Sequence, residues 1–189
     1  MHDIGELARR IERLETRAAI QELVSSYAIA CDEQDIGRLR ELFTEDAVFD
    51  SASGRMRAVG AEQVIAMLAG ALANRGPSCH WTHDVIVHPD PLDPERAAGV
   101  VYSHAETTPD GVVSLAAMRY HDEYRRTGGT WRFRRREISY LYYLPAAEYP
   151  AGLGQPLRVH AGGTVQRADY PETSPVWQAF REEQQRRKT

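Results

Sequence analysis

Residues 112–143 read VVSLAAMRYHDEYRRTGGTWRFRRREISYLYY, and this segment indicates the fold class most clearly. Apolar and polar side chains alternate with a period of two on both sides of the pair Gly128-Gly129. A glycine pair between two such runs allows a tight turn. The pattern predicts strands over 112–125 and 130–143 that pair as an antiparallel hairpin.

The preceding segments add further strands and helices. Strand-like runs cover 79–88 and 97–108, a short one covers 47–49, and Asp110-Gly111 is a second tight-turn signal. Apolar residues at helical spacing predict helices over 6–34, over a short run capped by Asp35, and over 61–74. Helices followed by consecutive strands with short links predict an α+β fold with a strongly curved antiparallel sheet.

The composition changes near Pro145. Residues 145–172 are rich in Pro, Gly and Ala, and Ser174 followed by Pro175 predicts the start of a last short helix. We therefore predict one domain over 1–145 and a C-terminal extension over 146–189.

The overall composition is that of a globular protein. The chain has 189 residues, 42% of them hydrophobic, and a net charge of −4, whereas proteins that bind nucleic acid are usually basic. No apolar run approaches the roughly 18 residues of a membrane span, and the first residues lack the basic and apolar blocks of a signal peptide. The two cysteines, Cys31 and Cys79, suit a reducing compartment. We expect a cytoplasmic protein without nucleic-acid or membrane partners.

Several functional motifs are absent from the sequence. It contains no dinucleotide-binding glycine motif, no phosphate-binding loop and no nucleophile elbow. His80 and His83 lie on opposite faces of a strand, and no cysteine pair accompanies them as in a zinc site. We therefore predict that the chemistry is proton transfer by side chains, without a metal or an organic cofactor.

Asp32 is the first candidate for that chemistry. It lies near the C-terminal end of the predicted first helix, where the helix dipole disfavours an anion. It also borders the apolar stripe of the helix instead of opposing it. A residue that breaks two local rules often marks a functional site. The alternative is a solvated acid, like its neighbour Glu33.

Other candidates lie on the helix and on the predicted strands. Tyr27 falls within the apolar helix stripe, so its ring should be buried and its hydroxyl needs a partner. His104 and Glu106 share one strand face.

The last strand is unusually basic. Trp131 and Phe133 share the parity expected to face the core, while Arg134 and Arg136 share the opposite one. A solvated outer face is the simplest interpretation of these arginines, although a bulge would turn Arg136 inward. Tyr140 follows and either lines a cavity or packs in the core.

The order of these motifs resembles the SnoaL-like group of the nuclear-transport-factor-2-like superfamily. The segments that carry the resemblance are RAAIQEL (17–23), Tyr27, Asp32, LFTEDAVF (42–49), Tyr124, Gly129 and WRF (131–133). The resemblance covers residues 6–145. It implies a cone-like sheet wrapped around N-terminal helices, an apolar cavity inside the sheet, and a homodimer or homotrimer.

Within this group the motifs are most similar to cofactor-free lyases, namely the scytalone dehydratases, the bile-acid dehydratases and the hexachlorocyclohexane dehydrochlorinases. This resemblance implies a catalytic Asp–His pair formed by Asp32 and His80. It also implies catalytic roles for Tyr27 and Arg136.

The resemblance implies substrate contacts as well. His104 and Trp81 match segments of these dehydratases, and Tyr140 is added as a candidate lining residue. Cys31 stands where scytalone dehydratases have a tyrosine, and Ala105 where bile-acid dehydratases have an acid. The identity of the substrate therefore stays open.

We predict a cofactor-independent lyase that acts on a small, apolar, cyclic substrate. His80 would take a C–H proton, and Asp32 would orient the imidazole and stabilise the imidazolium. Tyr27 or Arg136 would stabilise the departing group. One alternative is a polyketide cyclase or ketosteroid-type isomerase, in which the acid is the base. The other is a non-catalytic small-molecule-binding module.

Overall fold

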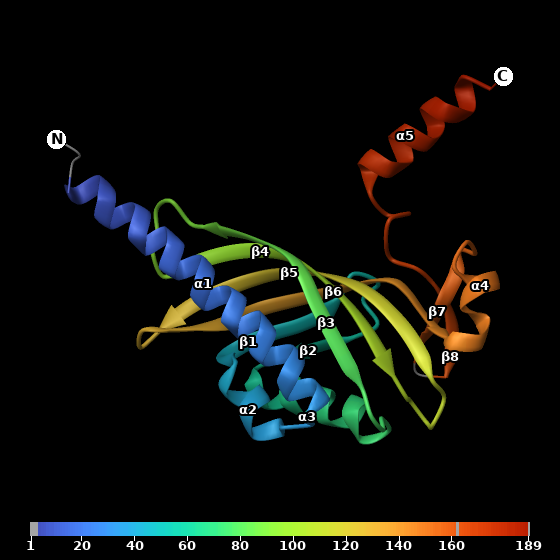
Figure 1. Ribbon diagram of the computed structural model, residues 1–189, viewed down its shortest axis with the longest axis horizontal. Helices are drawn as coiled ribbons and strands as arrows, with labels where there is room; N and C mark the ends of the chain where they lie inside the picture. The colour runs from blue at the N-terminus through green and yellow to red at the C-terminus, as the bar shows by residue number, and fades with distance from the viewer. Residues whose placement is uncertain (1–3, 162, 189) are drawn as a thin grey trace.

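The protein consists of N-terminal helices, a long sheet and a C-terminal extension (Figure 1). The computed structural model describes residues 4–161 and 163–188. The first helices are α1 (Ile4–Asp32), α2 (Ile36–Glu41) and α3 (Ala61–Ala73). The main strands are β1 (Phe43–Ser51), β2 (Arg57–Val59), β3 (Cys79–Pro89), β4 (Arg96–Thr107), β5 (Ser114–Thr127) and β6 (Thr130–Pro145). The extension contains the 3-10 turn Ala146–Glu148, α4 (Tyr149–Gly152), β7 (Leu157–Ala161), β8 (Thr164–Arg167) and α5 (Pro175–Arg186).

The main strands pair in the order β2-β1-β6-β5-β4-β3. Strands β3 to β6 form an antiparallel meander, as predicted, and β1 lies parallel to β6. Figure 1 shows α1 crossing the sheet diagonally, with α2 and α3 near its C-terminal end. The predicted α+β fold with a curved sheet on N-terminal helices is confirmed. The parallel pairing of β1 was not predictable, because side-chain periodicity does not indicate which strands are neighbours.

The core lies between the helices and the inner face of the sheet. The second half of α1 buries Ile20, Leu23, Val24, Tyr27 and Cys31, which recur at helical spacing. Helix α3 adds Val64, Ile65, Leu68 and Leu72. Because burial of each large apolar side chain contributes about 1.5–3 kcal/mol, this packing fixes where the end of α1 meets the sheet.

A β-bulge in β6 turns an arginine into the core. The register with β5 shifts between Phe133 and Arg135, which leaves Arg134 as the extra residue. Phe133 and Arg136 therefore both point inward, and their exposed fractions are 0% and 1%. The sequence offered this bulge only as an alternative to a solvated basic face. The bulge is present, so the expectation that Arg136 lies on a solvated face is wrong.

A further bulge in β6 places aromatic residues on the inner face. Leu141 is the extra residue, because Tyr140 pairs with Met118 while Tyr142 pairs with the adjacent Ala117. Tyr140 and Tyr143 then line the same cavity, although they are three positions apart on one strand. Their rings stack with centroids 5.9 Å apart.

Strand β3 also departs from strict alternation. Its register with β4 shifts between His83 and Ile86, and Asp84 has a φ of 51°. Aspartate tolerates this left-handed conformation better than most residues. Strict alternation would place Val87 on the same face as His83. Because of the bulge, Val87 is instead buried on the inner face, where His80 also lies.

The extension is anchored to the sheet by a buried arginine. β7 pairs in parallel with the end of β6, where Val159 lies opposite Tyr143. Arg158, which precedes Val159, donates to the carbonyl oxygens of Leu141 (2.6 Å) and Tyr170 (3.1 Å). It also forms a two-point ion pair with Glu172, at 2.6 and 2.8 Å. These bonds to Arg158 hold the pKa of Glu172 below its ordinary value.

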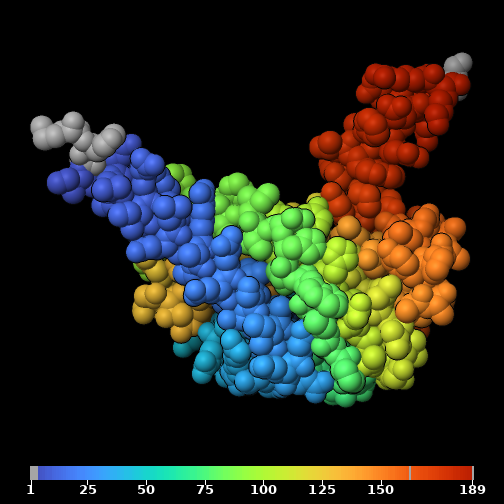
Figure 2. Space-filling view, viewed as in Figure 1, coloured from blue at the N-terminus to red at the C-terminus, as the bar shows by residue number. Residues whose placement is uncertain are grey.

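Helix α5 follows this anchored segment and projects away from the sheet (Figure 2). None of its residues is buried. Ser174 and Pro175 do begin the helix, as predicted, but the Ser174 side chain makes no capping hydrogen bond. No described helix is both long and apolar enough to cross a membrane.

Replacing Arg158 with methionine should loosen the extension. Methionine retains the apolar stem but leaves Glu172 and the Leu141 and Tyr170 carbonyls without the guanidinium. We expect a loss of about 2–3 kcal/mol of local stability, because bonds to charged groups are the stronger ones. Hydrogen exchange of residues 157–172 should accelerate, while Arg181→Met on the exposed α5 should leave it unchanged. Unaltered exchange in Arg158→Met would show that the hydrophobic contacts alone hold the extension.

Candidate active site

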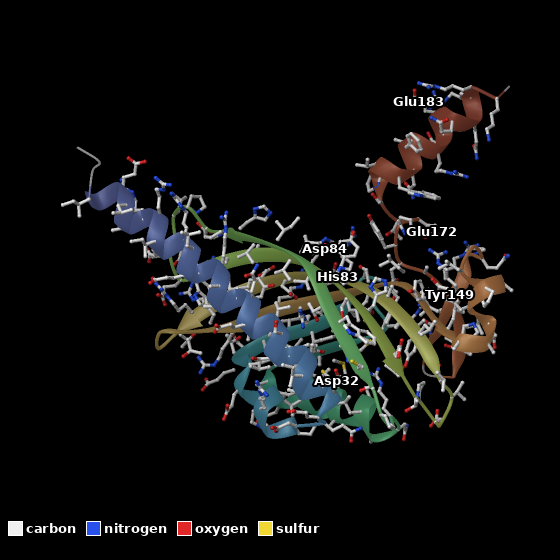
Figure 3. All side chains as sticks on the ribbon, viewed as in Figure 1. Asp32, His83, Asp84, Tyr149, Glu172 and Glu183 are labelled. Carbon is white, nitrogen blue, oxygen red and sulfur yellow. The ribbon has the colours of Figure 1, made fainter. Side chains whose placement is uncertain are left out.

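Asp32 and His80 meet where the end of α1 lies beside β3; Asp32 is labelled in Figure 3. His80 Nδ1 is 2.6 Å from Asp32 Oδ1, and the His80 backbone N–H donates to Oδ2 over 2.8 Å. The Ser78 hydroxyl donates to Oδ1 over 3.0 Å. Because the ring and the backbone of one residue bind both carboxylate oxygens, the imidazole is held in one orientation.

The contacts of Asp32 favour its ionised form. Burial alone raises the pKa of the carboxyl, but hydrogen bonds from the His80 ring, the His80 backbone and Ser78 hold the pKa below its ordinary 3.8. An ionised carboxylate can only accept hydrogen bonds, so Nδ1 of His80 carries the proton between them. In the neutral imidazole, Nε2 is then the nitrogen with a free electron pair.

This lowered pKa predicts a pH dependence of stability. The ionised Asp32 stabilises the fold above its unfolded-state pKa, and that contribution is lost as the pH falls through the lower folded-state pKa. We expect the stability advantage of the wild type over Asp32→Asn to shrink as the pH falls below about 5 and to disappear by about pH 2, below the folded-state pKa of Asp32. Urea unfolding of both proteins across this range measures it. The control Glu33→Gln alters an exposed neighbour. The difference between its free energy of unfolding and that of the wild type should not shrink as the pH falls. A constant difference between wild type and Asp32→Asn would contradict the expectation.

A small cavity adjoins His80 on the inner side of the sheet. Its volume is about 60 Å³. The walls are mainly apolar and include Phe49, Leu68, Leu72, Ala105, Met118 and Ile138. Met56 and Arg75, both half-buried, also line it. The cavity therefore places the Asp32–His80 pair beside a mainly apolar space that Arg75 also borders.

Tyr27 and Tyr140 supply hydroxyl groups to this cavity. Burial raises the pKa of Tyr140 to about 12 and that of Tyr27 well above its ordinary 10. Both hydroxyls are thus protonated at neutral pH and can donate hydrogen bonds. The nearby Tyr143 hydroxyl is paired with Thr107 at 3.0 Å, whereas the partner of the Tyr27 hydroxyl is the Cys31 thiol, which is a weak hydrogen-bonding group. Tyr27 and Tyr140 are therefore the better placed donors for a bound molecule.

Arg136 lies behind the cavity wall. Its guanidinium forms a two-point pair with Asp122, with both bonds at 2.9 Å. The guanidinium carbon is 4.3 Å from the Tyr27 ring centroid and 4.0 Å from that of Tyr120. Burial lowers the pKa of Arg136, but the pairing with Asp122 outweighs this and holds it above its ordinary value. Because both rings line the cavity and Arg136 does not, the structure separates Arg136 from direct contact with its contents.

Trp81 and His104 lie on the outer face of the sheet. On the inner face His80 pairs with Ala105, so the next pair, Trp81 and His104, points the other way. Trp81 is 50% exposed, and neither residue lines the cavity. The structure thus brings Asp32, His80, Tyr27 and Tyr140 together and leaves these two predicted substrate-binding residues elsewhere.

The outer face carries its own histidine cluster. His83 Nε2 is 2.7 Å from His104 Nδ1, and His83 Nδ1 is 2.9 Å from Asp84; Figure 3 labels His83 and Asp84 on β3. Within the part of the chain that the structure describes, no three His, Cys, Asp or Glu side chains are arranged to hold a metal ion.

Ser78 and Arg75 are site residues that the sequence did not reveal. Ser78 binds Asp32, and Arg75 lines the cavity from the loop that follows α3. Both lie in the turn-like run Asn74-Arg75-Gly76-Pro77-Ser78, which has the composition of an ordinary surface loop. The closeness of this loop to Asp32 depends on packing and leaves no local signal.

Comparison with known proteins identifies the family. Residues 12–137 match the SnoaL-like domain. The gamma-hexachlorocyclohexane dehydrochlorinase of Sphingobium indicum is 28% identical over 138 residues, which cover 72% of this chain and 88% of that enzyme. The crystal structure of LinA superposes with a TM-score of 0.66 at 26% identity, covering 73% of this chain and 94% of LinA. An NTF2-like protein with a cystatin-like fold from Novosphingobium aromaticivorans gives a TM-score of 0.59 at 26% identity, covering 82% and 99% of the two chains. The chain belongs to the SnoaL-like family.

Proposed function

We propose that this protein is a cofactor-independent lyase in which His80 is the general base and Asp32 its positioning residue. The observation that carries the proposal is the 2.6 Å contact between His80 and Asp32 at the edge of an apolar cavity. The similarity to a dehydrochlorinase, a lyase-type enzyme, supports the reaction class.

The reaction is an elimination. His80 Nε2 takes a proton from a C–H bond next to the carbon that bears the leaving group. The C–H electron pair becomes the new carbon–carbon π bond, and the leaving group departs with its own bonding pair. The imidazolium then gives its proton to the leaving group or to solvent. The ionised Asp32 stabilises the imidazolium between these steps.

The cavity hydroxyls stabilise the charge that develops during elimination. Tyr27 and Tyr140 present protonated phenols to the cavity, and such donors act strongly where water is excluded. Arg136 acts through Tyr27, because its guanidinium stacks on that ring without lining the cavity. We therefore assign Arg136 a supporting role in the proposed mechanism, and Tyr27 and Tyr140 the direct contacts.

The size of the cavity constrains the substrate. Its volume of about 60 Å³ is well below the roughly 150 Å³ that accommodates benzene in an engineered protein cavity. A ring-sized substrate thus requires a side chain in the wall to move. Met56 and Arg75, which line the cavity and are only half-buried, are long enough to do so.

The isomerase alternative fits the site less well. In that mechanism the acid itself takes the proton. Both oxygens of Asp32 already accept hydrogen bonds, and its pKa lies below the ordinary value. A weakly basic, fully engaged carboxylate is a poor proton acceptor.

Product analysis tests the proposal. The purified protein, treated with a chelator, is incubated with halogenated rings, hydroxylated steroids and polyketide intermediates, and the products are analysed by mass spectrometry. We expect loss of water or of a hydrogen halide without any added cofactor. An isomer of unchanged mass would favour an isomerase or cyclase, and tight binding without turnover would favour a non-catalytic module. The homodimer or homotrimer that forms part of the proposal is measured by sedimentation velocity on the same sample.

A further inference from the structure

Arg75 brings a positive charge to the wall of the cavity. It is half-buried and follows the last residues of α3. Its backbone N–H donates to the carbonyl of Leu72 over 2.9 Å, and its carbonyl accepts from Gln34 Nε2 over 2.9 Å. It also forms a β-bridge with Pro109. Because three separate segments hold its backbone, the start of its side chain is fixed beside the cavity.

The guanidinium of Arg75 differs from those of the other inward-facing arginines. Arg136 is neutralised by Asp122 and Arg158 by Glu172. Across residues 4–161 and 163–188, the Arg75 side chain has neither a hydrogen bond nor an ion pair. Asp32, the acid bonded to His80, is already occupied by the Ser78 and His80 donors.

The charge of Arg75 acts on the cavity itself. It opposes the rise in pKa that burial causes at the Tyr140 hydroxyl and at the Cys31 thiol, both of which also line the cavity. A partly desolvated cation is stabilised when an anion pairs with it, and arginine suits a carboxylate because both groups are planar and can form two parallel hydrogen bonds.

We propose that Arg75 binds a carboxylate of the substrate, so that the substrate is a small organic acid whose apolar part occupies the cavity. This inference rests on the proposed function, because it names the substrate class of the same site. The carboxylate would be held at Arg75 while the apolar carbons face Phe49, Leu68 and Ile138. One charged contact and an apolar wall would then orient the C–H bond toward His80.

Matched acids and amides test whether binding depends on the negative charge of the ligand. Propionate and propionamide, and benzoate and benzamide, have nearly the same shape within each pair and differ in charge. We expect the wild type to bind each acid at least about tenfold more tightly than its amide, as a charge-assisted contact implies. NMR titration measures these affinities, and the preference for the acid should weaken as salt is raised.

Variants then assign the preference to Arg75. Arg75→Met should remove it, and Arg75→Lys should retain part of it. The control Arg134→Met, on the outer face and paired with Asp46, should keep the full preference. If Arg75→Met does not fold, Arg75→Gln and the salt dependence of the wild type decide the question. Equal affinity for acid and amide in the wild type, or an unchanged preference in the folded Arg75 variants, would overturn the inference.

The outcome is separable from that of the proposed function. Elimination from neutral substrates that requires His80, without any preference for acids, would refute the Arg75 inference and leave the lyase proposal standing. An Arg75-dependent preference for acids, without turnover of any acid or neutral ring, would establish the anion site and refute the lyase.

Discussion

Replacing His80 with glutamine will lower kcat of the elimination by about 10²–10⁴-fold, which is the usual contribution of a positioned general base. Glutamine can still donate a hydrogen bond to Asp32 but cannot take up a proton at neutral pH. The apolar walls of the cavity are unchanged, so KM should change little. Steady-state kinetics on the substrate found by product analysis measures both parameters.

His104→Gln is the matched control for this variant. It makes the same chemical change on the outer face of the same pair of strands, outside the cavity. It should retain wild-type turnover. If His104→Gln is inactive and His80→Gln is active, the reaction occurs on the outer face and our assignment of the site is wrong.

Asp32→Asn distinguishes a positioning role from a merely structural one. Asparagine preserves the shape, but its single carbonyl oxygen can accept from Ser78 or from the His80 backbone and not from both, because these donors bind different oxygens of Asp32. The neutral amide also no longer stabilises the imidazolium. A structural role predicts a change in stability with kcat preserved. A positioning role predicts a large loss of kcat and a changed pH profile of kcat in a protein that remains folded.

Replacing Asp122 with alanine is expected to destabilise the protein by about 3–5 kcal/mol, because it leaves the fully buried Arg136 without its counter-charge. Asp122 accepts two bonds from Arg136 and one from the Tyr124 hydroxyl, at 2.9 Å each. The Nη1 atom of Arg136 is already buried without a partner among the described residues. For a chain of this length the loss corresponds to a fall in Tm of roughly 6–20 °C, measured by calorimetry.

Two further variants make this result specific. Glu183→Gln breaks an ion pair with Arg187 on the exposed α5 and should cost at most about 1 kcal/mol. The double variant Asp122→Leu with Arg136→Met removes both charges and should recover much of the stability that Asp122→Ala loses. If Asp122→Ala is no more harmful than Glu183→Gln, the buried pair does not hold the sheet together.

Local patterns were sufficient for much of the fold. Alternation with a period of two, interrupted at Asp110-Gly111 and Gly128-Gly129, located the four-stranded meander to within a few residues. Helical spacing located α1 and α3 in the same way. These features depend on near neighbours in the chain, because a strand or a helix exposes its pattern over every few residues.

Such local patterns did not predict where the bulges lie. Strict alternation assigns Arg136 to the face of Arg134, but the extra residue in β6 reverses this. In β3 the bulge at Asp84 shifts Val87 to the inner face in the same way. Where a strand gains an extra residue depends on its partner strand, which is distant in sequence.

The amino-acid sequence by itself determined the helices, the meander and the candidates Asp32 and His80. The helices and strands follow from the local spacing of apolar residues, and the candidates follow from a family motif. Only the tertiary structure joined Asp32 to His80, placed Arg75 beside the cavity, paired Arg136 with Asp122, and moved Trp81 and His104 to the opposite face. The reason is physical. These relations arise when segments tens of residues apart pack so that apolar faces are buried and charges find partners, and neither condition is visible in any one segment.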